Sequence, residues 1–115
     1  MQISFVIPCL NESNTIVDVI KDCHFVGKQF ESYEIIVSDN RSLDESAKLA
    51  LANNAKVVHS KIKGYGSSLK EGIKHAKGKY IVIGDADLTY DFKQTIEFIK
   101  FLDKGFDMVI GNRFK

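Results

Sequence analysis

The 115-residue sequence has only two cysteines, no long apolar run and almost no net charge. Cys9 and Cys23 are too few for a disulfide framework and lack the spacing of a structural zinc site, so we expect two reduced thiols in or near the core. No apolar run approaches the roughly 20 residues that a membrane-spanning helix needs. No basic and apolar leader opens the chain. These absences predict a cytoplasmic protein without a membrane span in this chain.

Charge of one sign is also lacking, because 16 basic residues oppose 15 acidic ones. The formal net charge of +1 gives no global drive toward nucleic acid or an anionic membrane, so any recognition by charge must be local. We expect no nucleic-acid partner. Lysines are dense within residues 56–79, where seven oppose the single acid Glu71. Lys70, Lys74 and Lys77 are expected on one solvated helix face.

Apolar and amphipathic segments alternate along the whole chain, which predicts an α/β fold. Hydrophobic residues make up 44% of the sequence, enough for one modest core in a single domain. Nearly continuous runs rich in Ile and Val predict strands covered on both faces, in a mainly parallel sheet between layers of helices. We therefore expect a three-layer sandwich. The expected strands are residues 3–8, 34–38, 56–60, 80–84 and 107–111.

The segments between these strands carry apolar residues at helical spacing, in residues 16–30, 69–76 and 92–102. Residues 42–45 have the form of a capping box, in which Ser42 would accept from the Glu45 amide at a helix start. Residues 91–94 have the same form. The chain stops just past the last expected strand, where an α/β domain usually continues, so we expect it to be part of a longer protein.

Polar residues follow four of the expected strands, at the edge where open α/β sheets bind ligands. Two alternatives stay open for them. Asn11, Ser13 and Asn14 would otherwise cap a helix, and Asp39 and Asn40 would otherwise bond their own turn. The polar segments are 8–14, 39–42, 61–68 and 85–87.

The third of these segments contains Gly64-Tyr65-Gly66 ahead of an expected helix. Backbone amides of such a loop and the positive end of a helix can hold a phosphate, and Lys61 and Lys63 beside it would help hold a diphosphate. The third glycine of a dinucleotide fingerprint and the Gly-Lys-Ser/Thr of a P-loop are both missing. The histidines lack metal-ligand spacing and are assigned no chemistry: His24, His59 and His75.

Two carboxylates, Asp85 and Asp87, follow the fourth expected strand one residue apart. In extended chain both would point the same way about 5 Å apart. Their repulsion would be about 3 kcal/mol at an effective dielectric of 20, which is large for a small domain. A bound Mg²⁺ or Mn²⁺, shared with phosphate oxygens of a substrate, would offset it. The alternatives are a pair splayed into solvent and an Asp87 that caps a turn.

Taken together, these segments resemble the nucleotide-binding half of the inverting family 2 glycosyltransferases, which have the GT-A fold. The chain is most similar to the branch of dolichyl-phosphate mannose synthases and polyprenyl-phosphate glycosyltransferases, through its Gly-Tyr-Gly loop, its Asp-Ala-Asp-x-x-Tyr-Asp run and Gly-Asn-Arg-Phe. Many relatives have glycine where this chain has Arg41. The matching segments cover nearly the whole chain, in order: 6–12, 34–44, 64–73, 78–87 and 107–114.

The resemblance implies metal-dependent transfer from a UDP- or GDP-linked sugar to an acceptor, plausibly a polyprenyl phosphate, with inversion, in cell envelope glycan biosynthesis. Asp85 and Asp87 would hold Mg²⁺ or Mn²⁺, Asp39 would face the base, and Arg113 would lie near the sugar-phosphate or acceptor. The remaining nucleotide-binding residues it implies are Pro8, Asn11, Glu12, Asn40, Ser42, Gly64, Gly66 and Ala86.

Residues 1–115 would then be the nucleotide-sugar-binding part of the enzyme, with the acceptor-binding part absent. The general base would lie beyond Lys115, so this chain alone is expected to be inactive. A longer form would be cytoplasmic, with the inner face of the membrane as one location. Two other readings stay open, a sugar-1-phosphate nucleotidyltransferase and a non-catalytic nucleotide-binding module. A nucleotidyltransferase would have a glycine-rich loop with basic residues directly after the first expected strand, where this chain has residues 8–12.

Overall fold

The computed structural model describes residues 2–84 and 108–109, and they form a parallel sheet with the strand order β3-β2-β1-β4-β5. Runs rich in Ile and Val form its central strands, as expected for strands that helices cover on both faces. The α/β fold with a mainly parallel sheet is therefore confirmed. The strands are β1 (Ile3–Cys9), β2 (Tyr33–Asp39), β3 (Lys56–His59), β4 (Tyr80–Ile83) and β5 (Met108–Val109).

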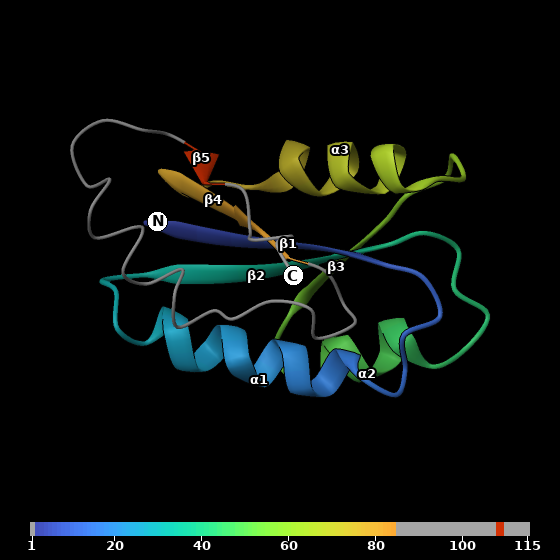
Figure 1. Cartoon of the computed structure of the whole chain (residues 1–115), viewed down its shortest axis with the longest axis horizontal. Helices are drawn as coiled ribbons and strands as arrows, with labels where there is room; N and C mark the ends of the chain where they lie inside the picture. The colour runs from blue at the N-terminus through green and yellow to red at the C-terminus, as the bar shows by residue number, and fades with distance from the viewer. Residues whose placement is uncertain (1, 85–107, 110–115) are drawn as a thin grey trace, which may run out of the picture.

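Helices cover both faces of this sheet, so the expected three layers are present (Figure 1). α1 (Ile16–Gly27) and α2 (Ser46–Ala52) lie on one face, and α3 (Tyr65–His75) lies on the other. The helix expected at 92–102 and the capping form at 91–94 lie outside the described residues. In the part of the chain that the structure describes, no helix is long and apolar enough to cross a membrane.

The main hydrophobic core lies between the sheet and α1. Phe5 of β1 is fully buried there, as are Ile16 and Ile20 of α1, which recur at helical spacing. Burial of side chains of this size stabilises the fold by roughly 1.5–3 kcal/mol each. Cys9 and Cys23 are free and buried, as the sequence predicts.

α3 packs unusually close to the opposite face of the sheet. A Cβ at Gly72 would lie only 2.5 Å from Cγ1 of Val6, so a larger residue there would push the helix away. Ser68, one turn earlier, donates from its hydroxyl to the backbone oxygen of Ser38 at 2.7 Å. This contact fixes the start of α3 beside the end of β2.

Three local expectations are wrong. The capping box does not form, because α2 begins at Ser46 after the cap residue Glu45 and the Ser42 hydroxyl binds another loop. α3 ends at His75, so Lys77 lies beyond the helix rather than on its face. α1 ends at Gly27, and Phe30 follows in a turn while still packing against the core.

A buried carboxylate at the amino edge of the sheet holds the segment that leads from α3 into β4. Glu34 of β2 accepts hydrogen bonds from the Ser4 hydroxyl at 2.5 Å and from the Lys77 amide at 2.7 Å. Its other oxygen lies 2.8 Å from the ammonium of Lys56. The Ser4 hydroxyl in turn accepts from the Gly78 amide. This network fixes where β4 enters the sheet.

Candidate functional site

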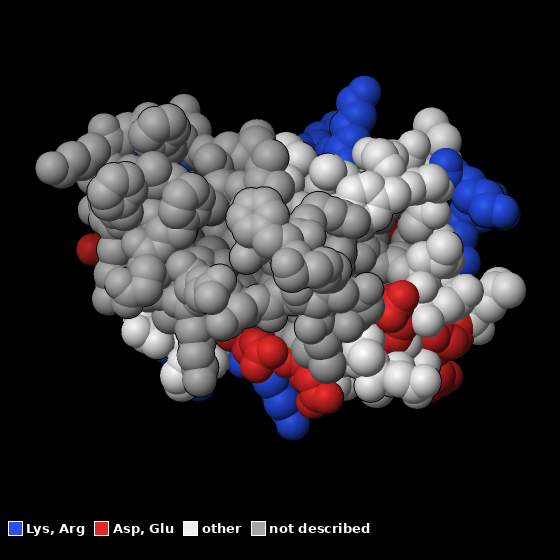
Figure 2. Space-filling view, viewed as in Figure 1, with Lys and Arg blue, Asp and Glu red and all other residues white. Residues whose placement is uncertain are grey.

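The carboxyl ends of β1, β2, β3 and β4 meet at one edge of the sheet, on the right in Figure 1. β1 pairs with β2 along its whole length but with β4 only as far as Val6, whose oxygen accepts from the Gly84 amide at 3.0 Å. The strand order reverses at β1, and ligands of open α/β sheets bind at such a reversal. Basic side chains lie above acidic ones at this edge (Figure 2). We call it the carboxyl edge.

The loops after β1 and β2 are joined by reciprocal hydrogen bonds. The Asn11 amide donates to the Ser42 hydroxyl at 2.9 Å, and the Leu43 amide donates to the side-chain oxygen of Asn11 at 2.8 Å. Asn11 has φ of 52°, a left-handed conformation that asparagine tolerates well. Asn11 therefore joins two loops and does not cap α1, which was the alternative reading of the sequence.

A second set of bonds between the same loops was missed by sequence reasoning. The Ser46 hydroxyl accepts from the Glu12 amide at 2.9 Å, and Asp44 accepts from the amides of Ser13 and Ser46. Desolvation raises the pKa of the Asp44 carboxyl, but the hydrogen bonds from the Ser46 hydroxyl and from the amides of Ser46 and Ser13 outweigh it and lower the pKa from 3.8 to about 2. The sequence signal is the Asp-x-Ser spacing of a side chain that binds its own turn.

Asn40 connects the loop after β2 to the loop after β3. It is 4% exposed, and its side-chain amide donates to the Ile62 oxygen at 2.9 Å while its side-chain oxygen accepts from the Gly64 amide at 3.0 Å. Gly64 has φ of 125°, which strongly favours glycine, and it precedes the first residue of α3. A Cβ at Gly66 would meet no atom within 4 Å, so the first turn of α3 is open at this point.

Asp39 ends β2 as a nearly buried carboxylate with one unpaired oxygen. The residue as a whole is 3% exposed. It pairs with Cys9 of β1 and His59 of β3 across the sheet. Oδ2 accepts from the Ser42 amide at 3.1 Å, which confirms the turn reading for this residue, while Oδ1 is buried and has no hydrogen-bond partner among the residues that the structure describes. A buried acceptor without a partner carries a free-energy cost, which a ligand N–H would offset.

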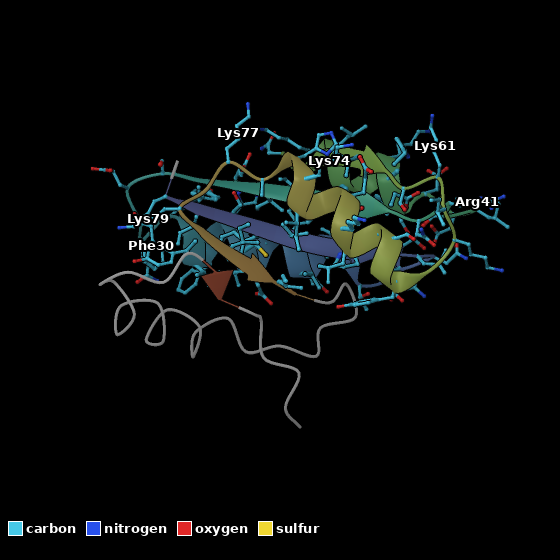
Figure 3. The ribbon with its side chains drawn as sticks, turned by 90° about the horizontal axis from the view of Figure 1, so that it is seen from above. Phe30, Arg41, Lys61, Lys74, Lys77 and Lys79 are labelled. Carbon is cyan, nitrogen blue, oxygen red and sulfur yellow. The ribbon has the colours of Figure 1, made fainter. Side chains whose placement is uncertain are left out.

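Arg41 adopts a left-handed backbone conformation with φ of 63°. Glycine adopts this conformation without strain, whereas other residues rarely do. Arg41 and Lys61 both lie at the carboxyl edge, on the right in Figure 3. Two basic residues therefore lie at this edge.

The predicted metal ligands Asp85 and Asp87 lie outside the described residues, as do Ala86 and Arg113. Gly84, the last described residue before them, ends β4 at the carboxyl edge beside β1. Within residues 2–84 and 108–109 no three His, Cys, Asp or Glu residues gather as a metal site would require. The other predicted nucleotide-binding residues all lie at or next to this edge: Pro8, Asn11, Glu12, Asp39, Asn40, Ser42, Gly64 and Gly66.

Residues 4–115 match the family model described as "Glycosyl transferase family 2". A hexosyltransferase of low-salt glycan biosynthesis from Haloferax volcanii is 34% identical over 113 residues, with 96% of this chain and 27% of the relative covered. An undecaprenyl-phosphate 4-deoxy-4-formamido-L-arabinose transferase from Edwardsiella ictaluri is 31% identical over 93% of this chain and 35% of its own length. The chain thus spans only part of these relatives.

Solved structures agree with this assignment. Glucosyl-3-phosphoglycerate synthase from Mycobacterium tuberculosis, in complex with Mn²⁺, UDP and phosphoglyceric acid, is 30% identical. The match covers 74% of this chain and 32% of that one, with a TM-score of 0.67. The layered fold, the loops joined at its carboxyl edge and the family match show the GT-A fold. The chain belongs to glycosyl transferase family 2.

Proposed function

We propose that residues 1–115 form the nucleotide-sugar-binding part of a glycosyltransferase that uses a UDP- or GDP-linked sugar. The observation that carries the proposal is that Asn11, Asn40 and Ser42 join three loops next to Asp39, whose Oδ1 has no hydrogen-bond partner among the described residues. A rigid polar edge at the reversal of strand order suits a nucleotide. Family membership favours glycosyl transfer over sugar-1-phosphate nucleotidyl transfer, and no glycine-rich basic loop follows β1.

Asp39 would accept a hydrogen bond from the nucleotide base. Uracil and guanine both carry a ring N–H that a carboxylate can bind, so this contact fits a uridine or a guanosine donor. Ser42 already binds the other carboxylate oxygen, which orients the side chain. The neighbouring His59 lies with Nδ1 4.0 Å from Asp39 Oδ2.

The loop before α3 would contact the pyrophosphate. The space around Gly66 in the first turn of α3 is open, and the start of this 11-residue helix favours an anion. Lys61 and Lys63 are exposed in the same loop and would add positive charge. Asn40 would hold this loop in place through Ile62 and Gly64.

Asp85 and Asp87 would hold Mg²⁺ or Mn²⁺, for which carboxylate and phosphate oxygens are suitable ligands. When bound, such an ion acts as a Lewis acid that stabilises the negative charge of a leaving nucleoside diphosphate. β4 would deliver both residues to the carboxyl edge, since Gly84 is fixed there by its bond to Val6. Mn²⁺ and UDP occur together in the synthase structure named above.

We propose that the acceptor is a polyprenyl phosphate. Its phosphate oxygen would form a bond to the anomeric carbon of the sugar from the face opposite the nucleoside diphosphate, the bond from that carbon to the diphosphate would break, and the configuration would invert. A relative named for undecaprenyl phosphate supports this class. A phosphate acceptor is already anionic, so it needs a strong general base less than a hydroxyl does. Arg113 would assist near the sugar-phosphate or acceptor, and the acceptor-binding part and any general base would follow Lys115.

Calorimetry of UDP and GDP binding to Asp39→Asn tests the proposal. The asparagine can keep the bond to the Ser42 amide with its oxygen, which turns its NH₂ group toward the base and opposes the base N–H. We expect at least tenfold weaker binding, and unchanged binding by Asp22→Asn, which makes the same charge change on the exposed surface of α1. Equal affinities of wild type and Asp39→Asn would contradict the role of Asp39.

A further inference from the structure

Within residues 2–84, charge is strongly segregated between the two faces of the sheet, although the whole chain is nearly neutral. Residues 60–79, which contain α3, carry six lysines and one acid, a net charge of +5. The segments 10–31 and 40–55, which contain α1 and α2, carry four basic and six acidic residues, a net charge of −2. Blue side chains accordingly gather over α3 and the loop before it in Figure 2.

The lysines of the α3 side are available for binding. All six are exposed, and within residues 2–84 none has a carboxylate within 4.0 Å. Lys79 lies over the Tyr80 ring, with Nζ 5.4 Å from the ring centroid, and the other five are considered together. Three of the five line one side of the molecule when α3 is viewed from above (Figure 3). We call these five residues the α3 basic surface: Lys61, Lys63, Lys70, Lys74 and Lys77.

Apolar side chains accompany the basic ones at one end of this surface. Ile62, between Lys61 and Lys63, is 72% exposed, and Tyr65 at the start of α3 is 47% exposed. Lysines beside exposed aliphatic and aromatic side chains suit a lipid interface, where the lysines meet headgroups and the apolar groups reach the acyl boundary. A surface that bound only the phosphates of a nucleic acid would not need the exposed Ile62.

We propose that the α3 basic surface docks on an anionic lipid bilayer. Each lysine near such a surface strengthens partitioning by about fivefold at moderate salt. Docking through Lys61 and Ile62 would bring the carboxyl edge close to the headgroups. A role for this docking in glycosyl transfer rests on the proposed function, because a polyprenyl phosphate acceptor resides in a bilayer. The binding of the α3 basic surface to a bilayer does not depend on the proposed function.

Sedimentation with vesicles tests this proposal directly. The chain is mixed with vesicles of phosphatidylcholine alone or with added phosphatidylglycerol, at low and physiological salt. We expect binding to the anionic vesicles only, weakened by salt. Lys70→Gln/Lys74→Gln/Lys77→Gln should lose at least tenfold in affinity, and Ile62→Ser should lose the binding that persists at higher salt.

The charge-matched control is Lys21→Gln/Lys28→Gln/Lys48→Gln, which removes three exposed lysines from the α1 and α2 side. It should bind anionic vesicles like the wild type. Equal losses in the two triple variants, absence of binding by the wild type, or preferential binding to RNA at the same salt would each overturn the proposal. Thermal unfolding checks that both variants are folded.

Nucleotide binding, measured on the same preparations, separates this proposal from the proposed function. The α3 variant changes none of the residues assigned to the nucleotide, so its affinity for UDP should equal that of the wild type. Vesicle binding without any nucleotide binding would contradict the proposed function and support docking on the bilayer. Nucleotide binding without vesicle binding would support the proposed function and contradict docking on the bilayer.

Discussion

The side-chain oxygen of Asn40 accepts a hydrogen bond from the backbone amide of Gly64 at 3.0 Å, across 24 residues of sequence. The same side chain donates to Ile62, so one buried amide holds the loop that leads into α3. Asn40→Ala would leave both partners without their bond, and we expect the free energy of unfolding to fall by about 2–3 kcal/mol. Urea unfolding measures this, with the exposed Asn14→Ala as control.

Asn14→Ala should change the free energy of unfolding by no more than about 0.5 kcal/mol, because Asn14 is exposed on the neighbouring loop. If Asn40→Ala were as mild as Asn14→Ala, the loop before α3 would not depend on Asn40. The proposed pyrophosphate contact would then lack its support.

Arg41 is a non-glycine residue at φ of 63°, and its replacement by glycine should stabilise the protein. Relief of the left-handed strain, about 1 kcal/mol, should outweigh the extra entropy of glycine in the unfolded chain. We expect Arg41→Gly to raise the free energy of unfolding by about 0.5 kcal/mol. Lys48→Gly within α2 should instead lower it by about 1 kcal/mol. A loss with Arg41→Gly would show that the arginine side chain stabilises this turn.

Glu34 should make stability depend on acid pH. Burial raises the pKa of its carboxyl, but hydrogen bonds from Lys56, Ser4 and the Lys77 amide outweigh this and hold the pKa below its ordinary value of 4.5. Because the folded-state pKa is the lower one, the contribution is complete above pH 4.5 and is lost as the pH falls through the folded-state value. The difference in unfolding free energy between wild type and Glu34→Ala should be about 2–3 kcal/mol at pH 7.

The same difference should shrink toward pH 3, as the Glu34 carboxyl becomes protonated in the wild type. Urea unfolding at both pH values measures it, with the exposed Glu31→Ala as the variant that should show little effect at either. A difference for Glu34→Ala that is the same at pH 7 and pH 3 would contradict the charge-assisted network.

The two cysteines should be inert in the folded protein. Burial raises the pKa of the Cys9 thiol to about 11 and that of Cys23 well above its ordinary value of 9.0. Thiolate is the reactive form, so labelling by iodoacetamide at pH 8 should be slow in the native protein and complete after unfolding in urea. Rapid labelling of native Cys9 would mean that the end of β1 is open to solvent.

The layered fold could be predicted because each apolar run was long and its period clear. The helix starts could not, since Ser42 satisfies the local capping pattern yet binds Asn11, which lies 31 residues away in the sequence. The loops were correctly expected to meet at one edge of the sheet, but the roles of Asp44 and Ser46 depend on contacts between loops that no single segment reveals. Lys77 lies outside the helix because Ala76 before it is already extended and the Lys77 amide donates to Glu34, which is 43 residues away in the sequence.

The central claim is that Asp85 and Asp87 hold a divalent cation that binds the pyrophosphate of the donor at the carboxyl edge. Calorimetry of UDP and GDP with and without Mn²⁺ tests it most directly, on the wild type and on Asp85→Ala/Asp87→Ala. We predict that Mn²⁺ strengthens binding of at least one nucleotide to the wild type by tenfold or more and has no effect on the variant. The same Mn²⁺-dependent affinity in both proteins would contradict the claim.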